Sequence, residues 1–156
     1  MLDSCRVMSM RIYLDCCCYN RPFDNVSQQR VQEEAAAVKS VLNSGECILG
    51  SDFLDMEIDM IKDVRKLDKV HRLYQLISEH VKATEAIFNR ACELRGCSSL
   101  KNMDSLHIAA AEAGGAEIFL TVDDRLIRSC KGVPVHVKIC NPVNFVRRCD
   151  HGGLEG

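Results

Sequence analysis

Four acidic residues lie where a folded chain would at least partly bury a carboxylate, and residues of this type point to metal chemistry. Asp15 and Asp123 directly follow short apolar runs, whereas Glu57 and Asp104 lie on the apolar stripes of two helical segments. Carboxylates about 4 Å apart repel by roughly 4 kcal/mol at an effective dielectric constant near 20, so a cluster of them needs cations or raised pKa values. Their hard oxygen atoms suit Mg²⁺ or Mn²⁺ better than softer metals. The sequence therefore predicts a magnesium or manganese site if the fold brings these acids together.

Each acid also fits a structural role. Asp104 lies near the start of a helical segment, where an aspartate commonly caps the helix or interacts favourably with its dipole. Asp123 fits a turn, and its neighbour Asp124 fits the N-cap of a short helix over residues 125–128. Glu57 is harder to explain in this way, because a solvated helix carries its glutamates on the polar face. The metal hypothesis therefore depends on all four acids together.

The elements that must position these acids alternate along the chain. Strands are expected at 11–15, 46–50, 117–121 and 134–139, and helices at 27–44, around Glu57 after a cap at Ser51 or Asp52, at 64–77, at 84–95, from Asp104 to Gly114, and after Asn141–Pro142. Such alternation implies a parallel sheet with right-handed crossovers. We predict an α/β fold, a three-layer α/β/α sandwich with a central, mainly parallel sheet of four to five strands. Ligands of such sheets bind beyond the carboxyl ends of the strands, where Asp15 and Asp123 are expected.

Length and composition predict one domain of ordinary size. The chain has 156 residues, 47% of them hydrophobic, enough for a single core. We expect one domain over residues 1–149 and a frayed tail over 150–156. No apolar run approaches the roughly 18 residues of a membrane span, and the first residues lack a charged-then-apolar signal pattern. We therefore predict a cytoplasmic protein without a membrane segment.

The ten cysteines do not form a zinc-binding pattern. There is no Cys-x-x-Cys pair, and no histidine pair completes a zinc motif. We expect reduced thiols, because a core of this size needs no disulfide staples. The run Cys16–Cys18 fits thiols packed at a strand-to-helix junction, and a nucleophile or soft-metal ligand there is the alternative.

The motifs, in this order, resemble those of a PIN domain, the family of small metal-dependent nucleases that includes the VapC-type toxins. The resemblance covers about residues 10–145. It is carried by the strand that ends at Asp15, the spacing from Ser51 to Glu57, the segment M-D-S-L-H-I-A-A-A at 103–111, and F-L-T-V-D-D-R-L at 119–126. The last two motifs are the most specific part. The resemblance implies Asp15, Glu57, Asp104 and Asp123 as the catalytic and metal-binding acids and Thr121 as a supporting hydroxyl. One position departs from the family pattern, because Cys16 stands where PIN domains commonly have Thr, Ser or Asn.

The function that this resemblance implies is a Mg²⁺- or Mn²⁺-dependent endoribonuclease acting on single-stranded RNA. Such a protein could be the toxin of a toxin–antitoxin pair, with an antitoxin as partner, and the family resemblance also implies a homodimer. One alternative is a catalytically weak PIN fold that binds RNA or protein, which Cys16 leaves open because a thiol is a weak hydrogen-bond donor. Another is a thiol-based redox or metal protein using Cys16–Cys18.

The sequence gives weaker indications of which residues contact the substrate. The formal net charge is −2, so binding of nucleic acid would need local patches. Arg21, in the loop after Asp15, is a candidate phosphate-binding residue, and an ion pair with Asp24 is its alternative. The basic residues of segment 65–72 fit a solvated helix face better than an RNA track. His107 fits a hydrogen-bonded packing residue, because Mg²⁺ has little use for imidazole.

Overall fold

The computed structural model describes residues 9–25 and 27–150 of the chain. Five strands form one sheet in the order β3-β2-β1-β4-β5. They are β1 (Arg11–Leu14), β2 (Cys47–Ser51), β3 (Glu79–Val81), β4 (Ile118–Leu120) and β5 (Lys138–Cys140). All neighbouring strands are parallel, so their carboxyl ends lie at one edge of the sheet. The predicted parallel sheet is confirmed, with five strands.

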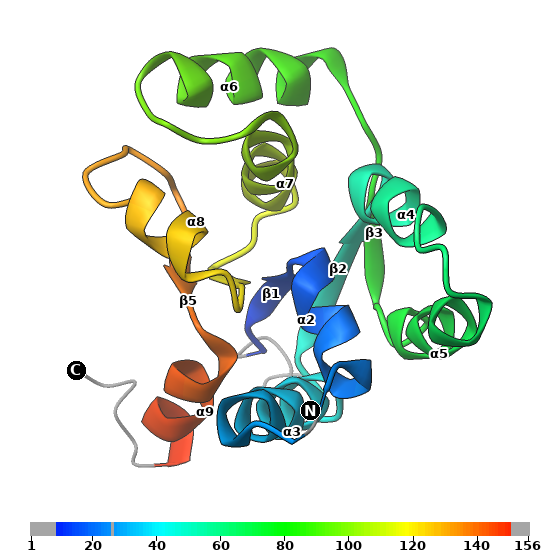
Figure 1. The fold of residues 1–156 in the computed structure, drawn as a ribbon. Helices are drawn as coiled ribbons and strands as arrows, with labels where there is room; N and C mark the ends of the chain where they lie inside the picture. Colours follow the sequence, from blue (N-terminus) through cyan, green and yellow to red (C-terminus); the bar gives the residue numbers. More distant parts are fainter. Residues whose placement is uncertain (1–8, 26, 151–156) are drawn as a thin grey trace, which may run out of the picture.

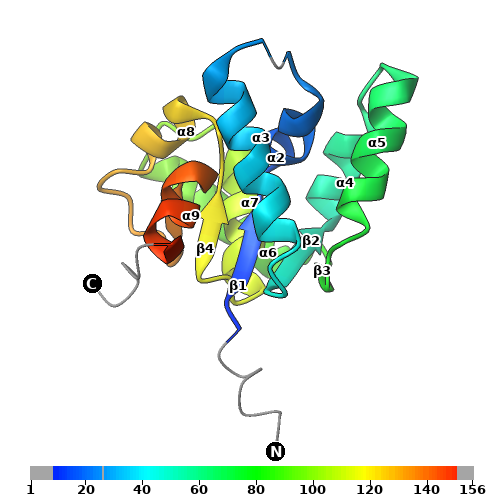
Figure 2. The same ribbon diagram turned by 90° about the horizontal axis from the view of Figure 1, so that it is seen from below.

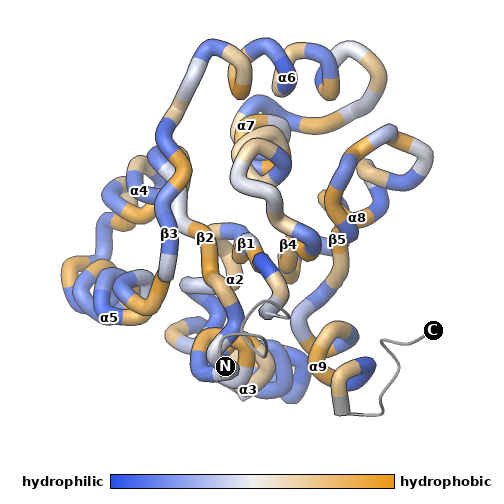
Figure 3. The backbone as a smooth tube through the Cα atoms, turned by 180° about the vertical axis from the view of Figure 1, so that it is seen from behind, coloured by the Kyte–Doolittle hydropathy of each residue, from blue (hydrophilic) through white to orange (hydrophobic). Residues whose placement is uncertain are grey.

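Helices cover both faces of this sheet (Figures 1 and 3). α3 (Gln29–Leu42) and α9 (Pro142–Asp150) lie side by side on one face, and α7 (Asn102–Ala113) lies over the other, with α6 (Glu85–Gly96) packed outside it. α4 (Asp52–Asp59) and α5 (Val64–Tyr74) lie beside the β3 edge (Figure 2). The short helices α2 (Cys16–Asn20), η1 (Arg21–Phe23) and α8 (Asp124–Ser129) follow β1 and β4. The predicted three-layer α/β/α sandwich is therefore confirmed.

The central strands are apolar along their length because helices cover them on both sides. Ile12, Tyr13 and Leu14 of β1 are fully buried, as are Phe119 and Leu120 of β4. Figure 3 shows the central strands as largely hydrophobic, whereas the helices carry mixed faces. This packing fixes the ends of β1 and β4, where Asp15 and Asp123 follow.

Several predicted helix caps are present. Ser51 caps α4 by accepting a hydrogen bond from the Leu54 amide at 3.0 Å. Asn141 accepts one from the Val143 amide at 2.8 Å and precedes Pro142 at the start of α9. α8 differs from the prediction, because its N-cap is Asp123 and not Asp124.

Three elements were not predicted: β3, α2 and the short η1 that follows α2. β3 is an exposed edge strand, and its segment Glu79–Val81 has no apolar alternation to mark it. α2 occupies Cys16–Asn20, where the sequence suggested a loop. At the other end, α9 runs to Asp150, and residues 151–156 of the expected frayed tail lie outside the described part of the chain. No helix within residues 9–25 and 27–150 is long and apolar enough to span a membrane.

Candidate metal centre

Asp15 lies at the carboxyl end of β1, and only 7% of its surface is exposed. It is also the N-cap of α2, because its Oδ1 accepts a hydrogen bond from the Cys16 amide at 2.8 Å. Its Oδ2 accepts one from the Thr121 hydroxyl at 3.0 Å and lies 3.5 Å from the Cys17 thiol. Burial raises the pKa of this carboxyl, and the nearby Glu57 raises it further. Asp15 is thus a buried acid held only by neutral hydrogen-bond donors and a nearby histidine.

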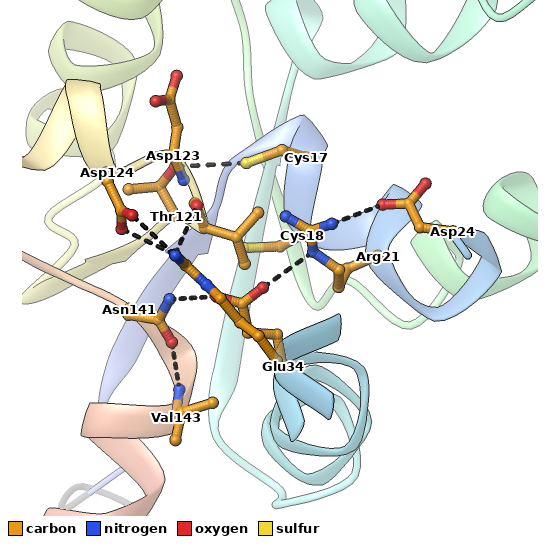
Figure 4. Close-up of polar contacts among 12 residues, drawn as sticks. Cys17, Cys18, Arg21, Asp24, Glu34, Thr121, Asp123, Asp124, Asn141 and Val143 are labelled. Carbon is orange, nitrogen blue, oxygen red and sulfur yellow. Dashed lines mark hydrogen bonds and ion pairs between the residues drawn. The ribbon is translucent and has the colours of Figure 1, made fainter. Parts of the chain in front are cut away.

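Thr121 joins the ends of β1 and β4. Its buried hydroxyl donates to Asp15 and accepts a hydrogen bond from the Asp123 amide at 3.1 Å. Asp123 in turn caps α8, with its Oδ1 2.9 Å from the Arg125 amide and 3.3 Å from the Leu126 amide. Among the described residues, no hydrogen bond reaches the second oxygen of Asp123. This exposed oxygen is available to a ligand (Figure 4).

Glu57 reaches the same site from α4. Its side chain is 33% exposed, and its Oε1 lies 2.6 Å from Nε2 of the buried His107 on α7. Ligand atoms of Asp15, Glu57 and His107 all lie within 4.8 Å of one another, close enough to hold one metal ion. The inward position predicted for Glu57 is therefore present, and His107 is the hydrogen-bonded residue that the sequence indicated.

Asp104 completes the group from the first turn of α7. The pKa of this half-buried carboxyl is raised to about 6, first by burial and then by the negative charges of Asp15 and Asp123, with a smaller contribution from Glu57. The charges of the other three acids therefore all act on Asp104. Within residues 9–25 and 27–150, no lysine or arginine forms an ion pair with any of the four acids. A cluster of this kind lacks the positive charge that it needs.

The same architecture occurs in solved structures of bacterial toxins or their complexes, among them the following three. VapBC2 from Rickettsia felis, bound to a promoter DNA fragment, matches with a TM-score of 0.58 and 16% identity over 85% of this chain and 98% of that chain. DNA-bound VapBC from Salmonella typhimurium matches with a TM-score of 0.59 and 14% identity over 85% and 98%. VapC20 from Mycobacterium tuberculosis, a toxin that cleaves the sarcin–ricin loop, matches with a TM-score of 0.56 and 16% identity over 81% and 98%. The chain has a PIN-domain fold of the VapC type.

The likeness to these PIN-fold proteins is one of structure. No family model matches the sequence, and no curated protein does. At identities of 14% to 16%, the matches establish the fold and leave the roles of individual residues to the geometry.

The donor set of this PIN fold fits a hard divalent cation. It offers carboxylate oxygens from α4, from α7 and from the N-caps of α2 and α8, and the imidazole of His107 already contacts Glu57. Mg²⁺ and Mn²⁺ prefer oxygen ligands of this kind. The acids form a cluster able to bind a metal, with oxygen chemistry that favours these two ions.

Arg21 is engaged in two ion pairs, with Asp24 and with Glu34 (Figure 4). Its Nη1 lies 3.1 Å from Asp24, and its Nε lies 3.1 Å from the buried Glu34. The ion pair with Asp24 that the sequence left open is therefore present. A phosphate at Arg21 would have to compete with both carboxylates.

The thiol nearest to Asp15 belongs to Cys17, not to the Cys16 that the sequence singled out. Cys17 Sγ lies 3.3 Å from the Thr121 hydroxyl, whereas the Cys16 side chain is buried and its pKa is raised to about 12 by burial. The sequence carried no signal for this contact, because α2 was not predicted and its first turn decides which thiol faces the acids. No disulfide joins cysteines of the described part of the chain.

Proposed function

We propose that this protein is a metal-dependent endoribonuclease that hydrolyses phosphodiester bonds of single-stranded RNA. Asp15, Glu57, Asp104 and Asp123 would hold Mg²⁺ or Mn²⁺. The observation that carries this proposal is geometric: ligand atoms of Asp15, Glu57 and His107 lie within 4.8 Å of one another, and Asp104 is near enough that, besides burial, the charges of Asp15 and Glu57 raise its pKa. A group of mutually repelling carboxylates with no cationic side chain paired to it gains most from a divalent cation.

Each residue has a role that follows from its contacts. A divalent cation bound there would activate water and neutralise the charge that develops on the phosphate oxygens. Asp15 is held in one orientation by the Thr121 hydroxyl and the first amide of α2. Glu57 has one oxygen fixed by His107, which leaves the other to accept a proton from water or to serve as a ligand. Asp104 in the first turn of α7 and Asp123 at the N-cap of α8 add two further negative charges.

The VapC-type fold supports a toxin as the biological form of this nuclease. Two of the matched structures are VapBC complexes, and VapC20 cleaves an RNA loop. By analogy, we propose a cytoplasmic toxin that forms a homodimer and is held by a cognate antitoxin. Arg21 is the proposed phosphate contact, released from Asp24 when RNA binds.

The test is cleavage of a labelled mixed-sequence single-stranded RNA with Mg²⁺, with Mn²⁺ or with EDTA. We expect cleavage only with a metal ion and none by Asp15→Asn, which keeps the size and capping ability of the side chain. Asp68→Asn is the matched control, because Asp68 is exposed on α5 and pairs with Arg72. Cleavage that persisted in EDTA or in Asp15→Asn would refute the proposal. RNA binding without cleavage would favour the catalytically weak binding module.

A further inference from the structure

A line of hydrogen bonds runs from β2 through the core to the acidic cluster. The Ser51 hydroxyl lies 2.7 Å from the Tyr13 hydroxyl, which lies 2.6 Å from His107 Nδ1. His107 Nε2 then lies 2.6 Å from Glu57 Oε1. Ser51, Tyr13 and His107 are at most 1% exposed. Four elements, β2, β1, α7 and α4, are thereby connected through side chains alone.

The hydrogen-bonding capacities of Glu57 at one end and Ser51 at the other determine which atom donates in each of these bonds. An ionised Glu57 carboxylate can only accept, so His107 Nε2 donates to it. In the neutral ring, Nδ1 then accepts from the Tyr13 hydroxyl. Tyr13 in turn accepts from Ser51, whose oxygen also accepts from the Leu54 amide at 3.0 Å. Every donor in the line has an acceptor, so the ring of His107 is fixed from both sides.

This line of hydrogen bonds ends at Oε1 of Glu57 and does not include Oε2. We propose that His107 is a positioning residue, which holds Oε1 of Glu57 so that Oε2 faces the bound cation or its water, while Tyr13 and Ser51 fix the imidazole ring. The inference rests on the proposed function, because it assigns a purpose to Glu57 within that site. Partners of this kind orient metal ligands in many sites, and their loss commonly weakens metal binding or activity by about 10- to 100-fold.

Unlike a lysine or an arginine, an imidazole can donate to a carboxylate without carrying a permanent positive charge. A cationic side chain at the same place would neutralise the carboxylate and reduce the attraction for the metal ion. The alternative is that His107 itself binds the metal, since its nitrogen lies within 4.8 Å of ligand atoms of Asp15 and Glu57. Direct ligation would require Nε2 to give up its hydrogen bond to Glu57. The two roles make different predictions when Glu57 is removed.

The experiment measures the affinity for Mn²⁺ by electron paramagnetic resonance, which needs no RNA cleavage. His107→Leu, of similar bulk but without a donor, should weaken Mn²⁺ binding by about 10- to 100-fold. His107→Gln, which keeps an N–H donor, should restore binding to within a few-fold of the parent. Tyr13→Phe removes only a hydroxyl and should weaken binding by a smaller factor. In a Glu57→Gln background, His107→Leu should have almost no further effect, because its contribution passes through Glu57.

Circular dichroism and melting curves establish which variants are folded, and Tyr13→Phe provides the result if His107→Leu fails to fold. Mn²⁺ affinity unchanged in both variants would overturn the inference. An equal loss for His107→Leu in the parent and in Glu57→Gln would also overturn it, in favour of direct ligation. If the parent bound no Mn²⁺, the proposed metal-dependent function and the inference would fall together. Coupled Mn²⁺ binding without RNA cleavage would uphold the inference and refute only the nuclease.

Discussion

Asp15 and Glu34 are both buried carboxylates, yet their partners differ in charge; Figure 4 shows those of Glu34. Glu34, on α3, is 1% exposed and lies 3.1 Å from Arg21 Nε, 2.9 Å from Arg30 Nε and 2.7 Å from Asn141 Nδ2. Asp15 is 7% exposed and receives hydrogen bonds from an amide, a hydroxyl and a thiol. Two guanidinium groups thus meet one acid, whereas no lysine or arginine of residues 9–25 and 27–150 pairs with the other.

The difference separates an acid that arginines of the chain neutralise from one that they do not reach. Burying a carboxylate is costly unless a cation or strong donors compensate, and around Glu34 the chain itself supplies that compensation. Arg30 extends the same network to Asp124, next to Asp123, with both nitrogen–oxygen distances at 2.8 Å. Around Asp15 the described residues place no lysine or arginine in an ion pair, and burial raises the pKa of this carboxyl. The comparison yields predictions in which the two regions respond in opposite directions.

The largest expected effect is on catalysis. Asp104→Asn should lower the rate of RNA cleavage by about a thousandfold or more, equivalent to roughly 4 kcal/mol in the barrier, because the cluster loses one negative ligand. Glu34→Gln should retain kcat within about threefold, since Glu34 is neutralised by arginines and lies outside the cluster. Single-turnover cleavage at saturating Mg²⁺ measures both. Similar losses in the two variants would remove the distinction.

The free energy of unfolding, in contrast, should depend on Glu34. Glu34→Gln should lower the free energy of unfolding by about 2 to 3 kcal/mol, because Arg21 and Arg30 lose their shared acceptor. Urea denaturation without metal measures this change. Glu33→Gln is the matched control, because it alters a neighbouring exposed glutamate on the same helix. A variant as stable as the parent would show that the Glu34 network is dispensable.

A smaller effect is expected in the pH dependence of the metal-free protein. The pKa of Asp104 is about 6 when folded, against an ordinary value of 3.8. Between these values the folded chain binds more protons than the unfolded chain, so stability falls as pH rises through this window. After allowance for solvent screening, the loss should be about 1 to 2 kcal/mol. Asp104→Asn should flatten this part of the profile and be the more stable protein at pH 7. Chemical denaturation at pH 4 to 7 tests this, and a profile unchanged by the substitution would contradict it.

The smallest effect is expected for the thiol at the cluster. Cys17→Ser replaces a weak donor near Asp15 with a stronger one and should change cleavage by less than about threefold. Alkylation of the parent protein is the complementary measurement. If alkylation abolishes the activity of the parent protein but not that of Cys17→Ser, the loss reflects the bulk of the group attached to Cys17. Loss of activity in Cys17→Ser itself would instead revive the thiol-based alternative.

Local patterns sufficed for much of the fold and for the positions of the acids. Short apolar runs marked β1 and β4, and an acid directly after each run marked their carboxyl ends. β3 escaped notice because two of its three residues, Glu79 and His80, are polar and exposed at an edge, where no apolar pattern is needed. α2 is five residues long, too short for a periodic signal, and owes its start to the capping by Asp15.

The partners of buried acids could not be predicted. Glu34 lies three residues after Val31 and four before Val38, on the same inward face, just as Glu57 lies between Leu54 and Ile61. The rule that an inward acid needs a partner applies to both equally. Only the tertiary fold decides that Arg21 and Arg30 reach one of them and His107 the other. Sequence patterns locate such acids, and their chemistry is settled by distant segments.

The pairing of β1 with β4 also constrains how the protein is made. Thr121 and Asp15 are 106 positions apart, and β1 lies at the centre of the sheet between β2 and β4. A chain emerging from the ribosome exposes the edge of β1 until β4 has been synthesised, and contacts of such long range form late. The acidic cluster therefore cannot form until Asp123 has left the ribosome and β4 has paired with β1. Any chemistry at this site thus depends on a contact between residues 106 positions apart, which no early fragment of the chain can make.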